Sequence, residues 1–188
     1  NNAWGYFPSV GAGWRISNES FMKNQKIFND LKLRFSYGVT GNSGGIGAYT
    51  SKLIFGITGT YNNNGVQDNS YGTVQGSTPD LQWEEVATTN LGLDFTILKN
   101  KVSGSLDWYD KKTTGMLFNY RVSPSLVPGG SIWANGGSIS NKGLELSLNA
   151  TPVSNKKMSW NTTFNIATNK NEITSLLGPY ANGDSIRY

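Results

Sequence analysis

Residues 31–39 read Leu31-Lys32-Leu33-Arg34-Phe35-Ser36-Tyr37-Gly38-Val39. Every odd position in this stretch is apolar or aromatic, and every even position is charged, small or polar. Because successive side chains of a β-strand point to opposite faces of the sheet, the stretch predicts a strand with one apolar face and one polar face. The same alternation recurs within residues 91–97, 102–108, 144–148 and 160–166. The sequence therefore predicts an all-β protein.

The composition argues against most catalytic chemistry. The 188 residues include no cysteine and no histidine. A disulfide scaffold, a thiol nucleophile, a Ser-His-Asp triad and the commonest zinc ligand are therefore excluded. Glu84 and Glu85 are adjacent carboxylates, but neighbours on a strand point to opposite faces and cannot converge on one bond. We expect no enzyme, and no catalytic, cofactor-binding or metal-binding residue.

The charged residues are spread along the chain. A net charge of +4 and a pI near 9.2 would suit an acidic partner. However, the 16 Lys and Arg residues are scattered, and the only adjacent basic pairs are Lys111-Lys112 and Lys156-Lys157. This pattern is typical of a solvated surface, and we do not expect a nucleic-acid partner.

The spacing of the alternating segments predicts six long strands with unequal connections. We place the strands at residues 4–16, 31–40, 81–98, 102–117, 138–151 and 158–170. No apolar run approaches the ~20 residues that a membrane-spanning helix needs. The connections 41–80 and 118–137 are long, whereas 99–101 and 152–157 are short. Short periplasmic turns that alternate with long extracellular loops are typical of an antiparallel transmembrane β-barrel.

The two faces of these strands have different expected surroundings. Charges in the middle of a strand are costly against lipid but are tolerated in a wet lumen. We therefore expect the lumen to receive Arg34, Asp94, Asp107 and Glu145. The opposite, lipid-facing surface is expected to hold Leu33, Phe35, Leu91, Leu93, Leu144 and Leu146.

Seven blocks of sequence follow one another in a recognisable order. Residues 4–16 read Trp-Gly-Tyr-Phe-Pro-Ser-Val-Gly-Ala-Gly-Trp-Arg-Ile, and residues 31–42 end in Tyr-Gly-Val-Thr-Gly-Asn. The remaining blocks are 90–95, 107–114, 141–146, 160–165 and 169–173. Together they resemble the barrel of SusC/RagA-type TonB-dependent outer-membrane transporters. Only the long connections 43–80 and 118–137 depart from the family pattern.

The resemblance implies a nutrient importer of the bacterial outer membrane. It implies contact with outer-membrane lipids, a SusD-like surface lipoprotein as a lid, and oligosaccharide or peptide cargo. It also implies energy from the TonB complex through a plug and a TonB box. Neither the plug nor the TonB box is recognised in this sequence, so we expect residues 1–188 to hold only barrel wall and loops. The alternative from a different class is a soluble or surface-anchored all-β carbohydrate-binding module.

The long connections hold the residues most suited to cargo or lid contact. Aromatic rings stack on sugar rings or apolar peptide side chains, and neighbouring amides supply hydrogen bonds. The candidates are Tyr61, Tyr71, Tyr120 and Trp133. Packing within the loops themselves is the alternative role for each. The apolar run at 49–57 is expected to be a hairpin arm or loop packing. A single extra membrane crossing there would place the start of the next long strand on the wrong side of the membrane.

Overall fold

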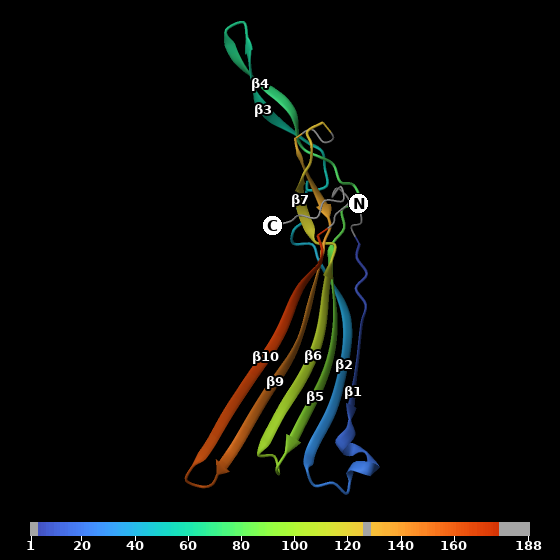
Figure 1. Ribbon diagram of the computed structural model, residues 1–188, viewed down its shortest axis with the longest axis vertical. Helices are drawn as coiled ribbons and strands as arrows, with labels where there is room; N and C mark the ends of the chain where they lie inside the picture. The colour runs from blue at the N-terminus through green and yellow to red at the C-terminus, as the bar shows by residue number, and fades with distance from the viewer. Residues whose placement is uncertain (1–3, 126–128, 177–188) are drawn as a thin grey trace.

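The computed structural model describes residues 4–125 and 129–176 (Figure 1). Its main element is one six-stranded sheet in the order β1-β2-β5-β6-β9-β10, in which every neighbouring pair is antiparallel. The strands are β1 (Ser9–Arg15), β2 (Phe28–Asn42), β5 (Glu84–Ile97), β6 (Val102–Thr114), β9 (Ser138–Ser154) and β10 (Ser159–Ser175). The prediction of an all-β fold with six long antiparallel strands is confirmed.

Two further hairpins fill the long connections. One consists of β3 (Ile54–Asn63) and β4 (Val66–Gln75), and the other of β7 (Leu117–Arg121) and β8 (Ser131–Asn135). Both lie beyond the same end of the sheet, and the β3–β4 hairpin projects farthest from it (Figure 1). The 3-10 helices η1 (Ile16–Asn18) and η2 (Ser20–Met22) lie at the opposite end. Among the described residues, no helix is long and apolar enough to cross a membrane.

Several strand boundaries differ from the predicted ones by a few residues, and two of the later starts have a physical reason. The first strand begins at Ser9 rather than residue 4, because Pro8 has no N–H to donate to the ladder. The Pro8 carbonyl still accepts a hydrogen bond from the Val39 N–H of the neighbouring strand, at 2.9 Å. The third long strand begins at Glu84 rather than residue 81, because Leu81 is buried within the loop region instead.

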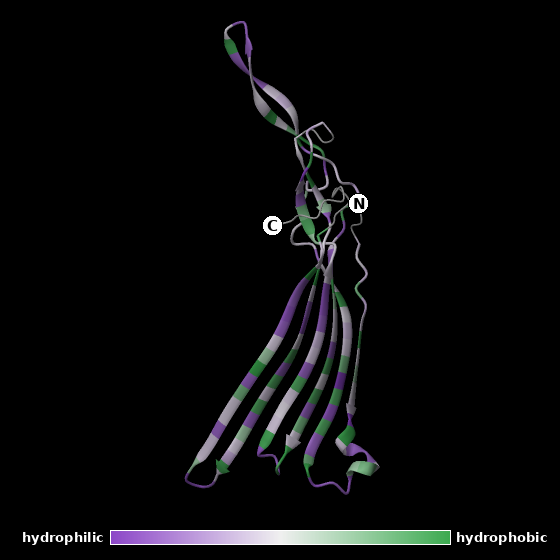
Figure 2. Cartoon of the chain, in the orientation of Figure 1, coloured by the Kyte–Doolittle hydropathy of each residue, from purple (hydrophilic) through white to green (hydrophobic). Residues whose placement is uncertain are grey.

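The register of the strands places apolar residues opposite apolar residues, and polar or small residues opposite one another, across the sheet. Leu33 lies opposite Leu93, which lies opposite Leu106, and the row continues through Leu146 to Ile166. The neighbouring row runs from Arg34 through Gly92, Asp107 and Glu145 to Ala167. Apolar and polar residues alternate along each strand (Figure 2). One face of the sheet is therefore apolar and the other polar.

Within residues 4–125 and 129–176, no second layer covers either face of the sheet (Figure 1). Within the described part of the chain, the buried apolar side chains are Leu81, Ile132 and Ala134, and all three belong to the loop region rather than to the sheet. Leu91, Trp108 and Leu144 on the apolar face remain more than two-fifths exposed. A soluble sandwich would bury this face against a second sheet. A single-layer sheet with an exposed apolar face is instead what a piece of barrel wall requires.

Candidate functional site

Three charged side chains meet on the polar face of the sheet. Arg34 on β2 donates from Nε to Asp94 Oδ2 and from Nη2 to Asp94 Oδ1, both at 2.8 Å. The same Nη2 donates to Asp107 Oδ1 at 2.9 Å. The guanidinium thus joins β2, β5 and β6. Its two hydrogen bonds to Asp94 have the bidentate geometry that makes an Arg–carboxylate pair strong. Three of the four charged residues expected in the lumen are therefore in direct contact.

Gly92 makes room for this ion cluster. It lies between Arg34 and Asp107 in the register of the three strands. A Cβ atom at this position would lie 2.5 Å from Asp107 Oδ1 and 2.7 Å from Arg34 Cζ. The absent side chain leaves room for the guanidinium to cross β5 and reach Asp107 on β6.

Glu145 lies in the same row, one strand farther along. The register sets Glu145 directly opposite Asp107. Like charges directly opposite each other on neighbouring strands destabilise a sheet. Arg34 offsets this repulsion by holding Asp107 in an ion pair. Among the described residues, Arg34 is the cation that forms ion pairs with both Asp94 and Asp107, which makes it the most sensitive member of the cluster.

We expect Arg34→Gln to destabilise the folded sheet by about 1–2 kcal/mol at neutral pH, because Asp94 and Asp107 lose the cation that they share while Glu145 stays opposite Asp107. Arg15→Gln is the matched control, because Arg15 forms an exposed pair with Asp30 at 3.1 Å. Exposed pairs of this kind contribute about 0–1 kcal/mol. Denaturant unfolding of the reconstituted full-length protein measures both variants, and equal losses of stability in the two would contradict the role of the cluster.

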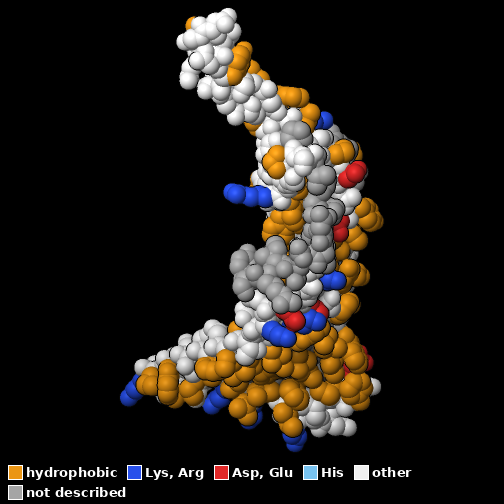
Figure 3. All heavy atoms as spheres, turned by 45° about the horizontal axis from the view of Figure 1, so that its top comes forward, with side chains coloured by type: hydrophobic (Ala, Val, Ile, Leu, Met, Phe, Trp, Pro, Cys, Tyr) orange, Lys and Arg blue, Asp and Glu red, His pale blue; other side chains and the backbone are white. Residues whose placement is uncertain are grey.

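The opposite face of the same strands carries the apolar residues. Leu33 and Phe35 flank Arg34 in sequence and therefore point away from it. The register extends this surface across the sheet through Leu91, Leu93, Leu144 and Leu146. The space-filling view shows an extended hydrophobic surface on the sheet (Figure 3). The structure thus separates the residues expected in lipid from those expected in the lumen.

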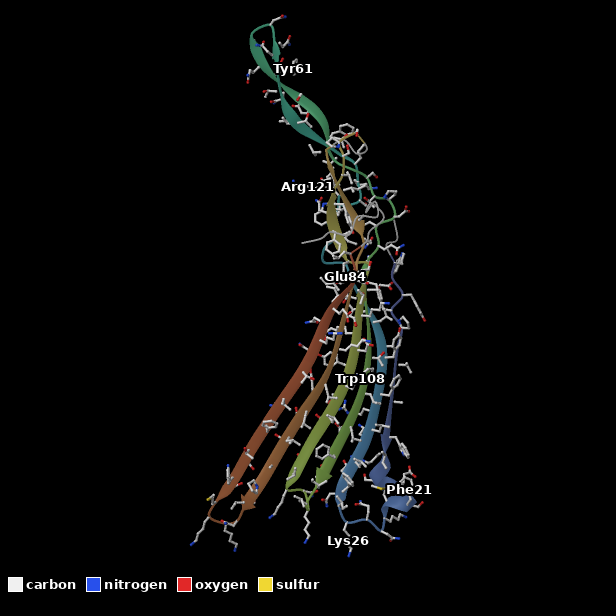
Figure 4. The ribbon with its side chains drawn as sticks, viewed as in Figure 1. Phe21, Lys26, Tyr61, Glu84, Trp108 and Arg121 are labelled. Atoms are coloured by element: carbon white, nitrogen blue, oxygen red, sulfur yellow. The ribbon has the colours of Figure 1, made fainter. Side chains whose placement is uncertain are left out.

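The β3–β4 hairpin presents two of the aromatic candidates far from the sheet. Its turn is Asn64-Gly65, with both residues at positive φ (51° and 89°). Asn-Gly at such a turn is a strong local signal for a hairpin. The register sets Tyr71 opposite Ile57 and Tyr61 opposite Asp68, so that the two tyrosines lie on opposite faces of the ribbon. Tyr61 lies near the far end of the hairpin (Figure 4).

One face of this hairpin carries an exposed apolar strip. Phe55, Ile57 and Tyr71 share the face and are 68%, 57% and 72% exposed. Gln75 holds the base of the hairpin, because its Nε2 donates to the carbonyls of Tyr49, Thr50 and Lys52 at 3.0–3.1 Å. The strip is thus exposed on an arm with an anchored base. The sequence predicted a hairpin arm or loop packing at 49–57, but it did not place Phe55, Ile57 and Tyr71 on one face, because β4 is poor in apolar residues.

The β7–β8 hairpin is packed rather than projecting. Tyr120 faces the buried Ile132, and burial raises the pKa of the Tyr120 phenol. Trp133 lies on the other face, and its carbonyl accepts a 2.6 Å bond from Thr78 Oγ1. Both rings are partly buried. Tyr120 and Trp133 are therefore less available to a partner than Tyr61 and Tyr71.

Asn135 fastens this hairpin to the end of the sheet, a role that the sequence did not signal. Its Nδ2 donates to the carbonyls of Gln82 and Gly115, each at 2.8 Å, and its Oδ1 accepts from the Gln82 N–H at 2.7 Å. The described residues contain no group of three or more Asp, Glu, His or Cys side chains that could hold a metal ion.

Comparison with known proteins agrees with this geometry. Residues 1–187 match the family described as TonB dependent receptor-like, beta-barrel. The chain belongs to this family. It is 39% identical over 176 residues to TonB-dependent receptor P39 of Formosa agariphila, with 94% of the chain covered. It is 36% identical over 182 residues to TonB-dependent receptor SusC of Bacteroides thetaiotaomicron, with 95% covered.

Solved structures show the same likeness for this TonB-dependent receptor barrel segment. The RagAB peptide importer in its open-open state matches 90% of the chain with a TM-score of 0.78 and 31% identity. Its closed-closed state matches 92% of the chain with a TM-score of 0.75. The chain spans only 16% and 18% of the lengths of P39 and SusC, and 18% of each RagAB chain. The aligned region is thus a fraction of each relative.

Proposed function

We propose that this chain forms part of the wall of a TonB-dependent importer in the bacterial outer membrane. The supporting observation is the single-layer sheet, with an uncovered apolar face on one side and the Arg34–Asp94–Asp107 cluster on the other. In this proposal Arg34, Asp94, Asp107 and Glu145 face the lumen, and the leucine-rich face contacts lipid. A soluble carbohydrate-binding module gains no support, because it would need a second layer over the apolar face.

The proposal gives the two ends of the sheet different surroundings. The short connections β5–β6 and β9–β10 lie in the periplasm, and both hairpins lie outside the cell. The apolar strip on β3–β4 contacts a SusD-like lipoprotein lid, and loop aromatics and amides contact an oligosaccharide or peptide cargo. Energy reaches the barrel from the TonB complex through a plug outside this segment.

Cysteine labelling tests the orientation, since the chain contains no cysteine of its own. In a full-length background without other cysteines, Thr60→Cys on β3 should react with a membrane-impermeant maleimide in intact cells. Asn155→Cys, in the β9–β10 turn, should react only after the outer membrane is permeabilised. The reverse pattern would overturn the orientation. Uptake of labelled oligosaccharides or peptides, compared with and without a protonophore, tests import itself.

A further inference from the structure

Lysines gather at the short-turn end of the sheet. The antiparallel order brings three connections together there: residues 16–27, 98–101 and 155–158. These connections contain Lys23, Lys26, Lys99, Lys101, Lys156 and Lys157, which we call the lysine rim. All six side chains are exposed. Six of the 16 basic residues of the chain are therefore at one end, although they are scattered in the sequence.

The acidic groups near the rim have other partners. Asp30 pairs with Arg15 at 3.1 Å and accepts a 2.8 Å bond from Ser17 Oγ. Glu19 accepts a 2.9 Å bond from Trp14 Nε1. None of the six rim lysines forms an ion pair within residues 4–125 and 129–176. The rim is thus a positive surface without an internal counter-charge.

Large apolar side chains stand among these lysines. Leu98 is 62% exposed and precedes Lys99 in a turn where both residues have positive φ (54° and 56°). Positive φ is unfavourable for residues with a side chain, and neither of these is a glycine. Met158 and Trp160 are also more than half exposed, next to Lys156 and Lys157. Phe21 and Lys26 lie at the same end (Figure 4).

Lysines beside exposed apolar side chains suit a charged membrane interface. A long lysine side chain can lie along apolar surface and keep its ammonium group at the headgroup level. Basic residues near an anionic membrane surface are attracted to it over about a Debye length. Figure 3 shows Lys and Arg side chains along the lower margin of the hydrophobic surface, where a bilayer boundary would lie.

We propose that the lysine rim binds the headgroups of anionic phospholipids in the leaflet at the short-turn end. This inference rests on the proposed membrane position of the sheet, and it adds a lipid preference that import alone does not require. The rim supplies the charge complementarity, and the flanking Leu98, Met158 and Trp160 enter the upper part of the acyl region. Zwitterionic lipid satisfies the apolar contacts but leaves the ammonium groups without an anion.

Native mass spectrometry of the purified full-length transporter can test this proposal. The protein in detergent is titrated with phosphatidylglycerol and, separately, with phosphatidylcholine at low ionic strength. Lys156→Gln with Lys157→Gln should weaken phosphatidylglycerol binding about 25-fold, on the basis of about five-fold per lysine. Phosphatidylcholine binding should stay unchanged. Raising the salt concentration should weaken phosphatidylglycerol binding to the native protein.

The matched control replaces the other adjacent basic pair of the chain. Lys111→Gln with Lys112→Gln removes the same charge from β6, at the hairpin end of the sheet, and should leave binding within two-fold of the native value. Equal losses in both variants, or no loss in the first, would overturn the proposal. Equally tight binding of glycerol phosphate alone would also overturn it, because the site would then be one for free phosphate. The lipid titration does not depend on transport. A negative uptake experiment would therefore contradict the proposed import without contradicting the lipid binding.

Discussion

Replacing Leu106 with arginine is expected to destabilise the membrane-inserted protein by about 2–4 kcal/mol. Leu106 lies in the middle of β6, in the apolar row between Leu93 and Leu146. A charged side chain near the bilayer midplane on the lipid face of a barrel costs about this much. Reversible unfolding of the full-length protein from lipid vesicles, followed by tryptophan fluorescence, measures the change.

Ser105→Arg is a control at nearly the same depth. Ser105 precedes Leu106 and points to the polar face, where it lies opposite Asp94 on β5 and Ser147 on β9. An arginine there meets water and a carboxylate, so the expected change is below about 0.5 kcal/mol. A larger loss of unfolding free energy for Ser105→Arg than for Leu106→Arg would show that the polar face contacts lipid, and it would refute the proposed lumen.

Deletion of residues 57–71 is expected to abolish docking of the proposed lipoprotein lid and leave the barrel inserted. The register sets Gly56 opposite Gly72 and Phe55 opposite Thr73. Joining Gly56 to Gly72 therefore leaves a two-residue Gly-Gly turn, which suits a tight hairpin. The deletion removes two of the three residues of the apolar strip without cutting the base held by Gln75. Co-purification of the tagged lipoprotein measures docking, and heat-modifiable migration on a gel measures insertion.

Point variants separate the strip from the rest of the hairpin. Phe55→Ser, Ile57→Ser and Tyr71→Ser together should weaken lid docking at least ten-fold, because the strip is exposed and available to a partner. Tyr61→Ser, on the opposite face of the ribbon, should change it less than two-fold. Unimpaired docking in the triple variant would assign the strip another role, and loss of insertion after the deletion would make the hairpin structural.

Much of the fold could be predicted because strand alternation is local information. A side chain such as Arg34 alternates with Leu33 and Phe35 whatever the rest of the chain does, so the strands and their faces follow from nearest neighbours. The two hairpins in the long connections were harder to predict. β7 and β8 have only five residues each, too few for a clear period, and β4 has little apolar content despite its Asn64-Gly65 turn.

The sequence by itself determined the all-β class, the six long strands and the residues that share each face. Only the tertiary structure decided which strands pair and in what register, because hydrogen bonds between strands join residues that are distant in the chain. Register brings Arg34 to Asp94 and Asp107, which are 60 and 73 positions away. The antiparallel order likewise gathers six scattered lysines at one end. Both groupings depend on spatial proximity, which the order of residues along the chain does not record.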